Sequence, residues 1–347
     1  VASIPDGTAT GGNARGANAV DLQSTRGGAT QVASGINSVI GGGSGNTNSG
    51  QLSVVSGGES NRISNSYNSY IGGGYNNIIT TLQYGSIVGG STNNISGQYG
   101  FIGSGASNTV SSNYSTVSGG QSNTASTNTH ATVVGGQINT SSGQYSISGG
   151  YQNTSSGRYS VSIGYQNNVT NEGSVSFGYS NNVSGLLSFN CGSQNTSNKD
   201  RNITLGTYAF AYISGQMAQS NGRFSISGDS QISNLILKNS ATLLSSNTLI
   251  LYADGASAIL QPDGSNRAWN VTVKWIAVVT AITGTATGVT VGDTITQVQT
   301  LGFKRVSTAS SLIGTANTIS TNSNTSMSTA TMTYTAGASQ ELALTFT

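Results

Sequence analysis

The chain has 347 residues, a formal net charge of +2 and only 6% charged residues, and it contains 49 glycines, two prolines and one cysteine. So small a net charge gives no electrostatic reason to expect nucleic acid or an anionic membrane as a partner. A single cysteine excludes an intrachain disulfide framework, and no apolar run is long enough to span a bilayer. The high glycine content excludes an average globular domain.

The first segment of the chain, residues 1–33, is a lead-in rich in glycine and alanine. Its composition predicts irregular backbone that becomes ordered against neighbouring chains. The charged residues of this lead-in are Asp6, Arg15, Asp21 and Arg26. We interpret the lead-in as an N-terminal attachment segment.

A short pattern then recurs twelve times between Ile40 and Ala209, in which a glycine is followed three residues later by asparagine. The spacing of these anchor glycines is longer up to the seventh copy, at Gly136, and is shorter and constant after it. Self-similarity at so regular a period is typical of a solenoid. The anchor glycines are Gly43, Gly58, Gly74, Gly90, Gly105, Gly120, Gly136, Gly150, Gly164, Gly178, Gly192 and Gly206. The asparagines are Asn46, Asn61, Asn77, Asn93, Asn108, Asn123, Asn139, Asn153, Asn167, Asn181 and Asn195, and Ala209 takes the twelfth position.

The length of the period decides which kind of solenoid is expected. A unit of about 15 residues is too short for a pair of helices, whereas two strands of about five residues joined by tight turns fit. Residues 160–164 and 173–177 alternate small polar with apolar side chains, which indicates strands. We therefore predict a parallel β-roll over residues 34–228, with a length of roughly 55 Å at the usual strand spacing.

Two repeated positions define the predicted interior and the predicted turn. The residue three before each anchor glycine is apolar in every unit, from Ile40 to Ile203, and we expect it to fill the interior. The glycines permit the positive φ of the turn, and the asparagines are expected to form a hydrogen-bonded structural ladder along it.

Coils of this size enclose too few aliphatic side chains to offset the entropy of ordering the chain. We therefore expect the remaining apolar surface to be buried between chains, most simply three around an axis. The residue before the anchor glycine is glycine or serine in the first eight coils, and then Ile163, Phe177, Cys191 and Leu205. We interpret this change as a thicker core in the last four coils, which would clamp the oligomer.

The C-terminal part, residues 229–347, has a different composition. Trp269 and Trp275 alternate with polar residues there, as in a half-buried strand. Short strands with turn signals and no helical pattern predict a β-sandwich or jelly-roll tip domain. The other expected strands are 235–237, 248–252, 258–260, 289–304, 328–335 and 341–347.

Residues that carry catalytic chemistry are scarce. The only histidine, His130, occupies a position that holds tyrosine in neighbouring coils, and we interpret it as an exposed member of a ladder. Cys191 is interpreted as a small core residue. Ten carboxylates are scattered along the chain. Among them a pairing of Asp254 with Asp263 stays open, as does a pair from adjacent chains, although turn chemistry explains both Asp-Gly steps.

These observations predict no catalytic residue, no metal site and no cofactor. The ligand-binding residues of the tip are unknown from the sequence. Trp269 and Trp275 are the candidates, because their rings are suited to stacking on a sugar, and filling of the core is the alternative interpretation.

The repeat units also resemble known families. Units 160–164, 174–178 and 202–206 resemble the head repeats of trimeric autotransporter adhesins, which implies a left-handed parallel β-roll with three chains per rod. Other segments are similar to bacteriophage tail-fibre proteins, which implies a fibre or spike on a virion. These segments are 5–16, 114–126, 226–229 and 249–255.

We therefore expect a homotrimeric structural and adhesive protein of a bacteriophage tail or other surface fibre, located outside the cell on the virion. The N-terminus would contact other virion proteins, and the tip would attach to a host surface glycan or protein receptor. We expect no nucleic-acid partner and no membrane insertion.

Three alternatives stay open: a fragment of a bacterial surface adhesin, an ice-binding solenoid, and a polysaccharide depolymerase with its site between chains. Ice binding requires a flat, regular face of small polar residues. The position two before the anchor glycine is too mixed for this, since it includes Gly41, Val88, Val134 and Asn190.

Overall fold

The structure is a computed structural model that describes residues 7–8, 11–80, 83–223, 226–228 and 230–236, and the strand segments 249–250, 267–278, 294–306, 309–323, 332–336 and 342–346. These residues form strands and turns, with no helix among them. The chain divides into two compact units, which are described separately. The first comprises Val1–Ala211 and Met217–Ile232, and the second comprises Tyr212–Gln216 and Ser233–Thr347.

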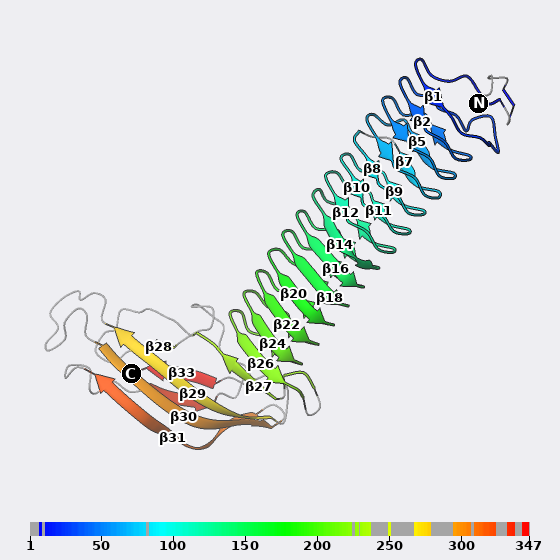
Figure 1. Ribbon diagram of the computed structural model, residues 1–347. Helices are drawn as coiled ribbons and strands as arrows, with labels where there is room; N and C mark the ends of the chain where they lie inside the picture. Colours follow the sequence, from blue (N-terminus) through cyan, green and yellow to red (C-terminus); the bar gives the residue numbers. More distant parts are fainter. Residues whose placement is uncertain are drawn as a thin grey trace, which may run out of the picture. The chain divides into compact units, whose positions relative to one another are not determined.

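The first unit is a parallel β-solenoid of about 13 coils, which confirms the predicted all-β solenoid (Figure 1). Most coils contribute one strand to each of two sheets, called sheet A and sheet B. Sheet A begins at β1, inside the predicted lead-in. Its strands, in order, are β1 (Val20–Asp21), β2 (Val39–Ile40), β4 (Val54–Val55), β6 (Tyr70–Ile71), β8 (Ser86–Ile87), β10 (Phe101–Ile102), β12 (Thr116–Val117), β14 (Thr132–Gln137), β16 (Ile147–Tyr151), β18 (Val161–Tyr165), β20 (Val175–Tyr179), β22 (Phe189–Ser193), β24 (Ile203–Thr207), β26 (Met217–Asn221) and β27 (Gln231–Asn234).

Sheet B lies on the other side of each coil and has twelve strands. In order they are β3 (Thr47–Asn48), β5 (Arg62–Ser64), β7 (Ile78–Thr80), β9 (Asn94–Ile95), β11 (Thr109–Val110), β13 (Thr124–Ala125), β15 (Thr140–Ser141), β17 (Thr154–Ser155), β19 (Asn168–Val169), β21 (Asn182–Val183), β23 (Thr196–Ser197) and β25 (Phe210–Ala211). In almost every strand the first residue faces outward and the second inward, so each sheet contributes one column of inward side chains.

The anchor glycines hold a turn that other residues fit poorly. Gly58 has φ of 84°, and a Cβ built on it would lie 2.2 Å from the carbonyl oxygen of Gly74 in the next coil. That distance is far inside van der Waals contact, and the positive φ disfavours any residue with a Cβ. Glycine at this position therefore lets successive coils approach closely.

The inward column of sheet A is aliphatic in the coils whose anchor glycines run from Gly43 to Gly136, here called the long coils. Its members are Ile40, Val55, Ile71, Ile87, Ile102, Val117 and Val133, and all are fully buried. They face the buried column of sheet B, which holds Ile63, Ile79, Ile95, Val110 and Ala125, with the polar Asn48 and Ser141 at its two ends. The apolar residues of the two columns form one continuous core, which is the interior that the repeat predicts.

The coils whose anchor glycines run from Gly150 to Gly206, here called the short coils, differ from the sequence prediction. A shift of register in β14 aligns Thr132 with Ile147 and Val133 with Ser148. The apolar residue three before the anchor glycine therefore turns outward from Ile147 on, and the following residue takes its place inside. The prediction that this apolar position is interior in all twelve units is wrong for the short coils.

One missing residue causes this reversal. Two residues separate Val133 from the anchor Gly136, whereas one separates Ser148 from the anchor Gly150, and the two glycines remain aligned. Because side chains alternate between the faces of a strand, a slip of one residue moves each of them to the opposite face.

The second unit contains two three-stranded antiparallel sheets. One has the order β28 (Leu249–Ile250), β33 (Leu342–Phe346), β32 (Met332–Ala336), and the other the order β29 (Arg267–Val278), β30 (Thr294–Val306), β31 (Ala309–Ser323). Most of the expected strands have a counterpart here, but β31 was missed, because its run of serine, threonine and alanine does not alternate. The expected strand 258–260 lies outside the described residues. The predicted β-sandwich arrangement of these sheets stays a prediction.

Candidate functional site

The short coils carry an apolar face on the outside of sheet A, here called the outer apolar face. Its residues are Ile147, Val161, Val175, Phe189 and Ile203, with Ile163, Phe177, Cys191 and Leu205 two positions further along the strands. These side chains are half-buried or exposed in the single chain, Phe177 to 38% and Ile203 to 40%. The parallel register aligns Phe177 with Cys191 and Cys191 with Leu205.

The interior of the same coils is mostly polar. The inward column of sheet A holds Ser148, Ser162, Ser176, Asn190 and Thr204, all fully buried. Several of these side chains bond to the chain itself: Ser162 Oγ donates to the carbonyl of Asn167 at 3.1 Å, and Ser176 Oγ donates to Asn167 Oδ1 at 3.2 Å. The short coils therefore place most of their apolar side chains outside and their polar ones inside.

The expectation of a thicker core in the last four coils is wrong. Ile163, Phe177, Cys191 and Leu205 do share one column, but it belongs to the outer apolar face. Cys191 is half-exposed for the same reason, so it is not a core residue of its own chain. The physical cause is again the one-residue slip at β14.

A ladder of stacked rings, here called the tyrosine ladder, runs along the corner where the chain enters sheet A. It consists of Tyr84, Tyr99, Tyr114, His130, Tyr145 and Tyr159, with ring centroids 4.7 to 5.4 Å apart. All six residues have positive φ. His130 stacks on Tyr114 at 5.0 Å and on Tyr145 at 4.7 Å, and it is exposed, in the position expected from the repeat.

Stacking covers the ring faces of this ladder, on which a ligand could otherwise stack. Each inner ring has a neighbouring ring on both faces, and the guanidinium of Arg158 lies 4.5 Å from the ring centroid of Tyr159 at the end. The ring edges and hydroxyl groups are what remain for solvent. The inner rings of the ladder therefore offer no free aromatic face on which a sugar would stack.

The asparagines form a buried column that runs through long and short coils alike. Asn93 is representative: its Nδ2 donates to Gly89 O at 3.1 Å and Gly105 O at 2.9 Å, while its Oδ1 accepts from Asn108 N at 3.0 Å. The chain of bonds starts where Gln23 Oε1 accepts from Asn46 N and ends where Asn195 Oδ1 accepts from Ala209 N. This column satisfies buried backbone groups that the turn leaves free.

The outer side of sheet B is a second regular surface, here called the hydroxyl face. Over eight coils, the outward residue of each strand and the residue two positions after it are threonine, serine or asparagine, with no charged and no large side chain. The first positions are Asn94, Thr109, Thr124, Thr140, Thr154, Asn168, Asn182 and Thr196, and the second are Ser96, Ser111, Ser126, Ser142, Ser156, Thr170, Ser184 and Asn198.

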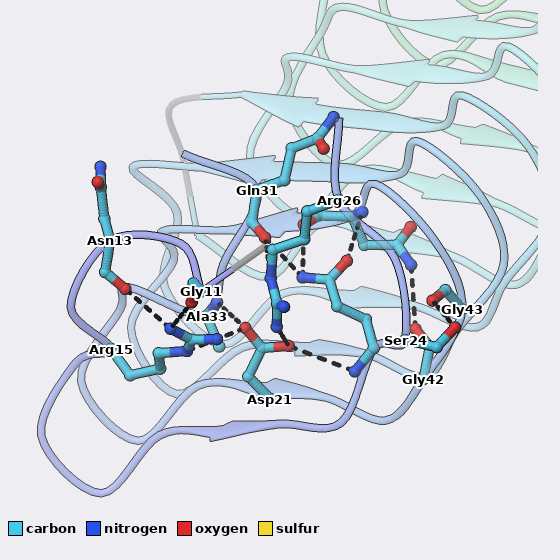
Figure 2. Close-up of polar contacts among 12 residues, drawn as sticks. Gly11, Asn13, Arg15, Asp21, Ser24, Arg26, Gln31, Ala33, Gly42 and Gly43 are labelled. Carbon is cyan, nitrogen blue, oxygen red and sulfur yellow. Dashed lines mark hydrogen bonds and ion pairs between the residues drawn. The ribbon is translucent and has the colours of Figure 1, made fainter. Parts of the chain in front are cut away.

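The N-terminal end of the solenoid is closed by an ionic cluster, here called the cap. Asp21 is in register with Ile40 and so occupies the inward column of sheet A. Figure 2 shows Arg15 and Arg26 on either side of its carboxylate: Arg15 Nε lies 3.3 Å from Oδ2 and Arg26 Nη2 lies 3.0 Å from Oδ1. The predicted irregular lead-in is thus partly ordered by its own chain. The members of this cluster follow one another at irregular separations outside any repeat, so no pattern in the sequence indicates that they meet.

The remaining predicted candidates belong to residues 229–347. Trp269 and Trp275 lie in β29, opposite Phe303 and Gln297 of β30, and their side chains are outside the description. Asp254 and Asp263 lie outside the described residues. Within the described part of the chain, no group of three potential metal ligands occurs, and no helix is long and apolar enough to cross a membrane.

Comparison with known proteins gives no assignment: no known protein family matches the chain, and no curated protein matches its sequence. The outer apolar face and the hydroxyl face are the two regular surfaces of the described solenoid from which a function can be inferred.

Proposed function

We propose that this protein is a structural and adhesive fibre subunit, three copies of which associate through the outer apolar faces of their short coils. The observation that carries the proposal is the reversal between the two kinds of coil. In the short coils the interior is mostly polar, so the apolar side chains of these coils are available for burial against another surface. Exposed, continuous apolar patches mark interaction sites.

A second copy of the chain is the partner that best fits this face. The side chains repeat with the rise of the solenoid, and a partner must repeat at the same distance to cover them coil by coil. A parallel copy in register meets that condition. The face carries no charge, which favours a like partner over an acidic or basic one.

The adhesive part of the proposal concerns residues 229–347. Such a fibre would use the solenoid as its shaft, left-handed as in the head repeats it resembles, and the C-terminal unit as a tip that binds a glycan or protein on a host surface. The N-terminal end would attach to other proteins of a virion. The similarity of the repeat units to tail-fibre and adhesin repeats supports this assignment.

Cys191 tests the association directly, because it is the only cysteine of the chain and lies in the middle of the outer apolar face. Mild oxidation of the assembled protein should give a disulfide-linked dimer, and light scattering should give the mass of three chains. Only two of three cysteines around an axis can pair, so one chain in three should stay unlinked.

A matched control moves the thiol to the other side of the coil. The double variant Cys191→Ser with Ser142→Cys places it on the hydroxyl face, and no linked dimer should form. A chain that stays monomeric at all concentrations would contradict the proposal. Deleting residues 229–347 should leave the oligomeric shaft and abolish adsorption to host cells, and undiminished adsorption would contradict the role of the tip.

The hydroxyl face supports a second candidate function, ice binding. Its two columns of small polar side chains are held at the spacing of parallel strands, about 4.8 Å, and its threonines are stiff because they are β-branched. This regularity lies on sheet B, away from the mixed position that argued against ice binding. Thermal hysteresis of the intact protein tests it, and Thr124→Lys should abolish any effect while the corner variant Gln121→Lys should not.

A further inference from the structure

Two aromatic side chains stand in the outward column of sheet A in the long coils. Tyr70 and Phe101 are each in register with Ser86, which lies between them, so the two rings are two coils apart. At the usual spacing of parallel strands this separation is about 9.6 Å. Tyr70 is 40% exposed and Phe101 is 38% exposed, whereas Ile71 and Ile102, which follow them in the chain, are fully buried.

Each of these rings leans along its own strand over a glycine. The hydroxyl of Tyr70 lies 3.0 Å from a Cβ built on Gly72, and Cε1 of Phe101 lies 3.6 Å from a Cβ built on Gly103. Side chains in strands lean along the strand in this way. Ser56 Oγ donates to the hydroxyl of Tyr70 at 3.5 Å, which helps to hold that ring. Because glycine lets the ring lie down on the sheet, one ring face is turned to the backbone and the other to solvent.

The two rings differ from those of the tyrosine ladder in their neighbours. Tyr70 is in register with Val54 and Ser86, and Phe101 with Ser86 and Thr116, and none of these neighbours is aromatic. Ser86 is small and half-buried, and its hydroxyl can donate and accept. The outward positions of β4 to β12, and the positions two residues after them, hold no charged side chain. The surface therefore offers two aromatic faces with a hydroxyl group between them and no charge.

A chain of neutral sugars matches this arrangement. We propose that Tyr70, Ser86 and Phe101 bind a neutral, linear polysaccharide that lies along the solenoid axis. A pyranose ring has an apolar face of C–H groups that packs on an aromatic ring, and hydroxyl groups at its edge that bond to polar side chains. In an extended β-linked chain each sugar advances by nearly the step between parallel strands, and alternate sugars present the same face. One sugar then lies on Tyr70, the next over Ser86 and the third on Phe101.

A second copy of the chain fits these rings less well than a polysaccharide does. The outer apolar face of the short coils presents a large apolar side chain in nearly every coil, as a surface buried against a like copy requires. Here a serine separates the two rings, and a glycine lies beside each of them. The inference concerns the long coils alone, so it does not depend on the proposed association through the short coils.

The length of the sugar chain provides the first test, by isothermal titration calorimetry of the full-length protein. The probes are cello-oligosaccharides and chito-oligosaccharides, both of which have extended β linkages. A disaccharide reaches one ring and a tetrasaccharide reaches both, so the tetrasaccharide of at least one series should bind roughly tenfold more tightly than its disaccharide. Maltotetraose, whose α linkages coil the chain, should gain no such advantage over maltose. Absence of binding in both β-linked series, or equal affinity for both lengths, would overturn the proposal.

Variants of the two rings locate the binding. Tyr70→Ala and Phe101→Ala should each weaken binding of the tetrasaccharide about 2- to 10-fold, because each removes one stacking surface. Tyr67→Ala is the matched control, since Tyr67 is a 46% exposed tyrosine in a separate column with Gln51 and Gln83, and it should bind like the parent protein.

The double variant Tyr70→Ala with Phe101→Ala separates this site from the other possibilities. Undiminished binding by the double variant would place the sugar on another part of the chain, such as residues 229–347, and would overturn the proposal. Light scattering of the same variant should show unchanged association. Weakened association would show that a second copy covers these rings, which would also overturn the proposal.

Discussion

The long coils and the short coils share one backbone plan and reverse its contents. From Ile40 to Val133 the inward column of sheet A is aliphatic, and from Ser148 to Thr204 it is polar. The anchor glycines and the asparagine column continue through both regions without interruption. The turn therefore fixes the path of the coil, whereas the side chains between the turns decide whether the interior of a coil is apolar or polar.

The largest expected effect is the loss of an aliphatic side chain inside a long coil. Ile71 is fully buried between Val55 and Ile87 of the adjacent coils. Ile71→Ala should lower the free energy of unfolding by about 2–5 kcal/mol, because it removes buried methyl groups and leaves a cavity. Chemical denaturation followed by hydrogen exchange in the long coils measures this loss.

The same column in a short coil provides the contrast. Ser162 has its hydroxyl bonded to the carbonyl of Asn167, so Ser162→Ala should cost only about 0.5–1.5 kcal/mol. Equal losses of unfolding free energy for Ile71→Ala and Ser162→Ala would show that the apolar and the polar interior contribute equally to stability, which would contradict this prediction.

The asparagine column should be equally important in both regions. Asn93→Ala in a long coil and Asn167→Ala in a short coil each leave a buried backbone N–H of the next coil without its acceptor. Each variant should lose roughly 1–3 kcal/mol of unfolding free energy. A loss confined to one region, measured by urea denaturation, would mean that the turn does not fix both kinds of coil.

The outer apolar face should affect association more than folding of the single chain. Phe177→Ser removes a large side chain that is 38% exposed in one copy. If other copies bury this remaining exposed part, association should weaken by about 1 kcal/mol per chain, and therefore by about 3 kcal/mol per trimer. Light scattering over a dilution series measures this change. Val88→Ser, at an exposed outward position of a long coil, should leave the dissociation midpoint unchanged.

The smallest effect is expected in the tyrosine ladder. Tyr114 stacks on two rings, which contributes about 0.5–1.5 kcal/mol per pair. Its backbone, however, has φ of 56°, a conformation that costs about 1–2 kcal/mol for most residues and less for asparagine. Tyr114→Asn should therefore shift the unfolding free energy, measured by urea denaturation, by only about 1 kcal/mol. A loss as large as that of Ile71→Ala would show that the ladder is a main source of stability.

Much of the solenoid was predictable because the glycine and asparagine of its turn recur at nearly regular intervals in the sequence. Gly58 and Asn61 recur in one register, and glycine at positive φ with a bonded asparagine leaves few other structures. The reversal at Ser148 was not predicted, because Ile147 keeps its distance from the anchor glycine while changing faces. The signal for the reversal was the shortening of the period. When a coil loses one residue, either its anchor glycine falls out of alignment with the previous one or the side chains of its strand move to the opposite face.

The outer apolar face and the cap show two further limits. The sequence predicts that Phe177 and Cys191 share one column. Whether that column faces the interior or the outside of the coil depends on the strand register, which the structure supplies. In the cap, Arg15, Asp21 and Arg26 meet through the path of an irregular backbone, which no periodicity encodes. The repeated features of the chain can therefore be predicted from its sequence, whereas a cluster of side chains that occurs once cannot.

The unbroken asparagine column has a consequence for how the molecule can change length. Each member bonds within its own coil and to the coils immediately before and after it, so the link between neighbouring coils has the same form along the column. Removal or duplication of one whole unit, such as residues 165–178, rejoins identical partners and needs no compensating substitution elsewhere. The solenoid can therefore be lengthened or shortened by whole coils, each of which changes its length by about one strand spacing, roughly 4.8 Å.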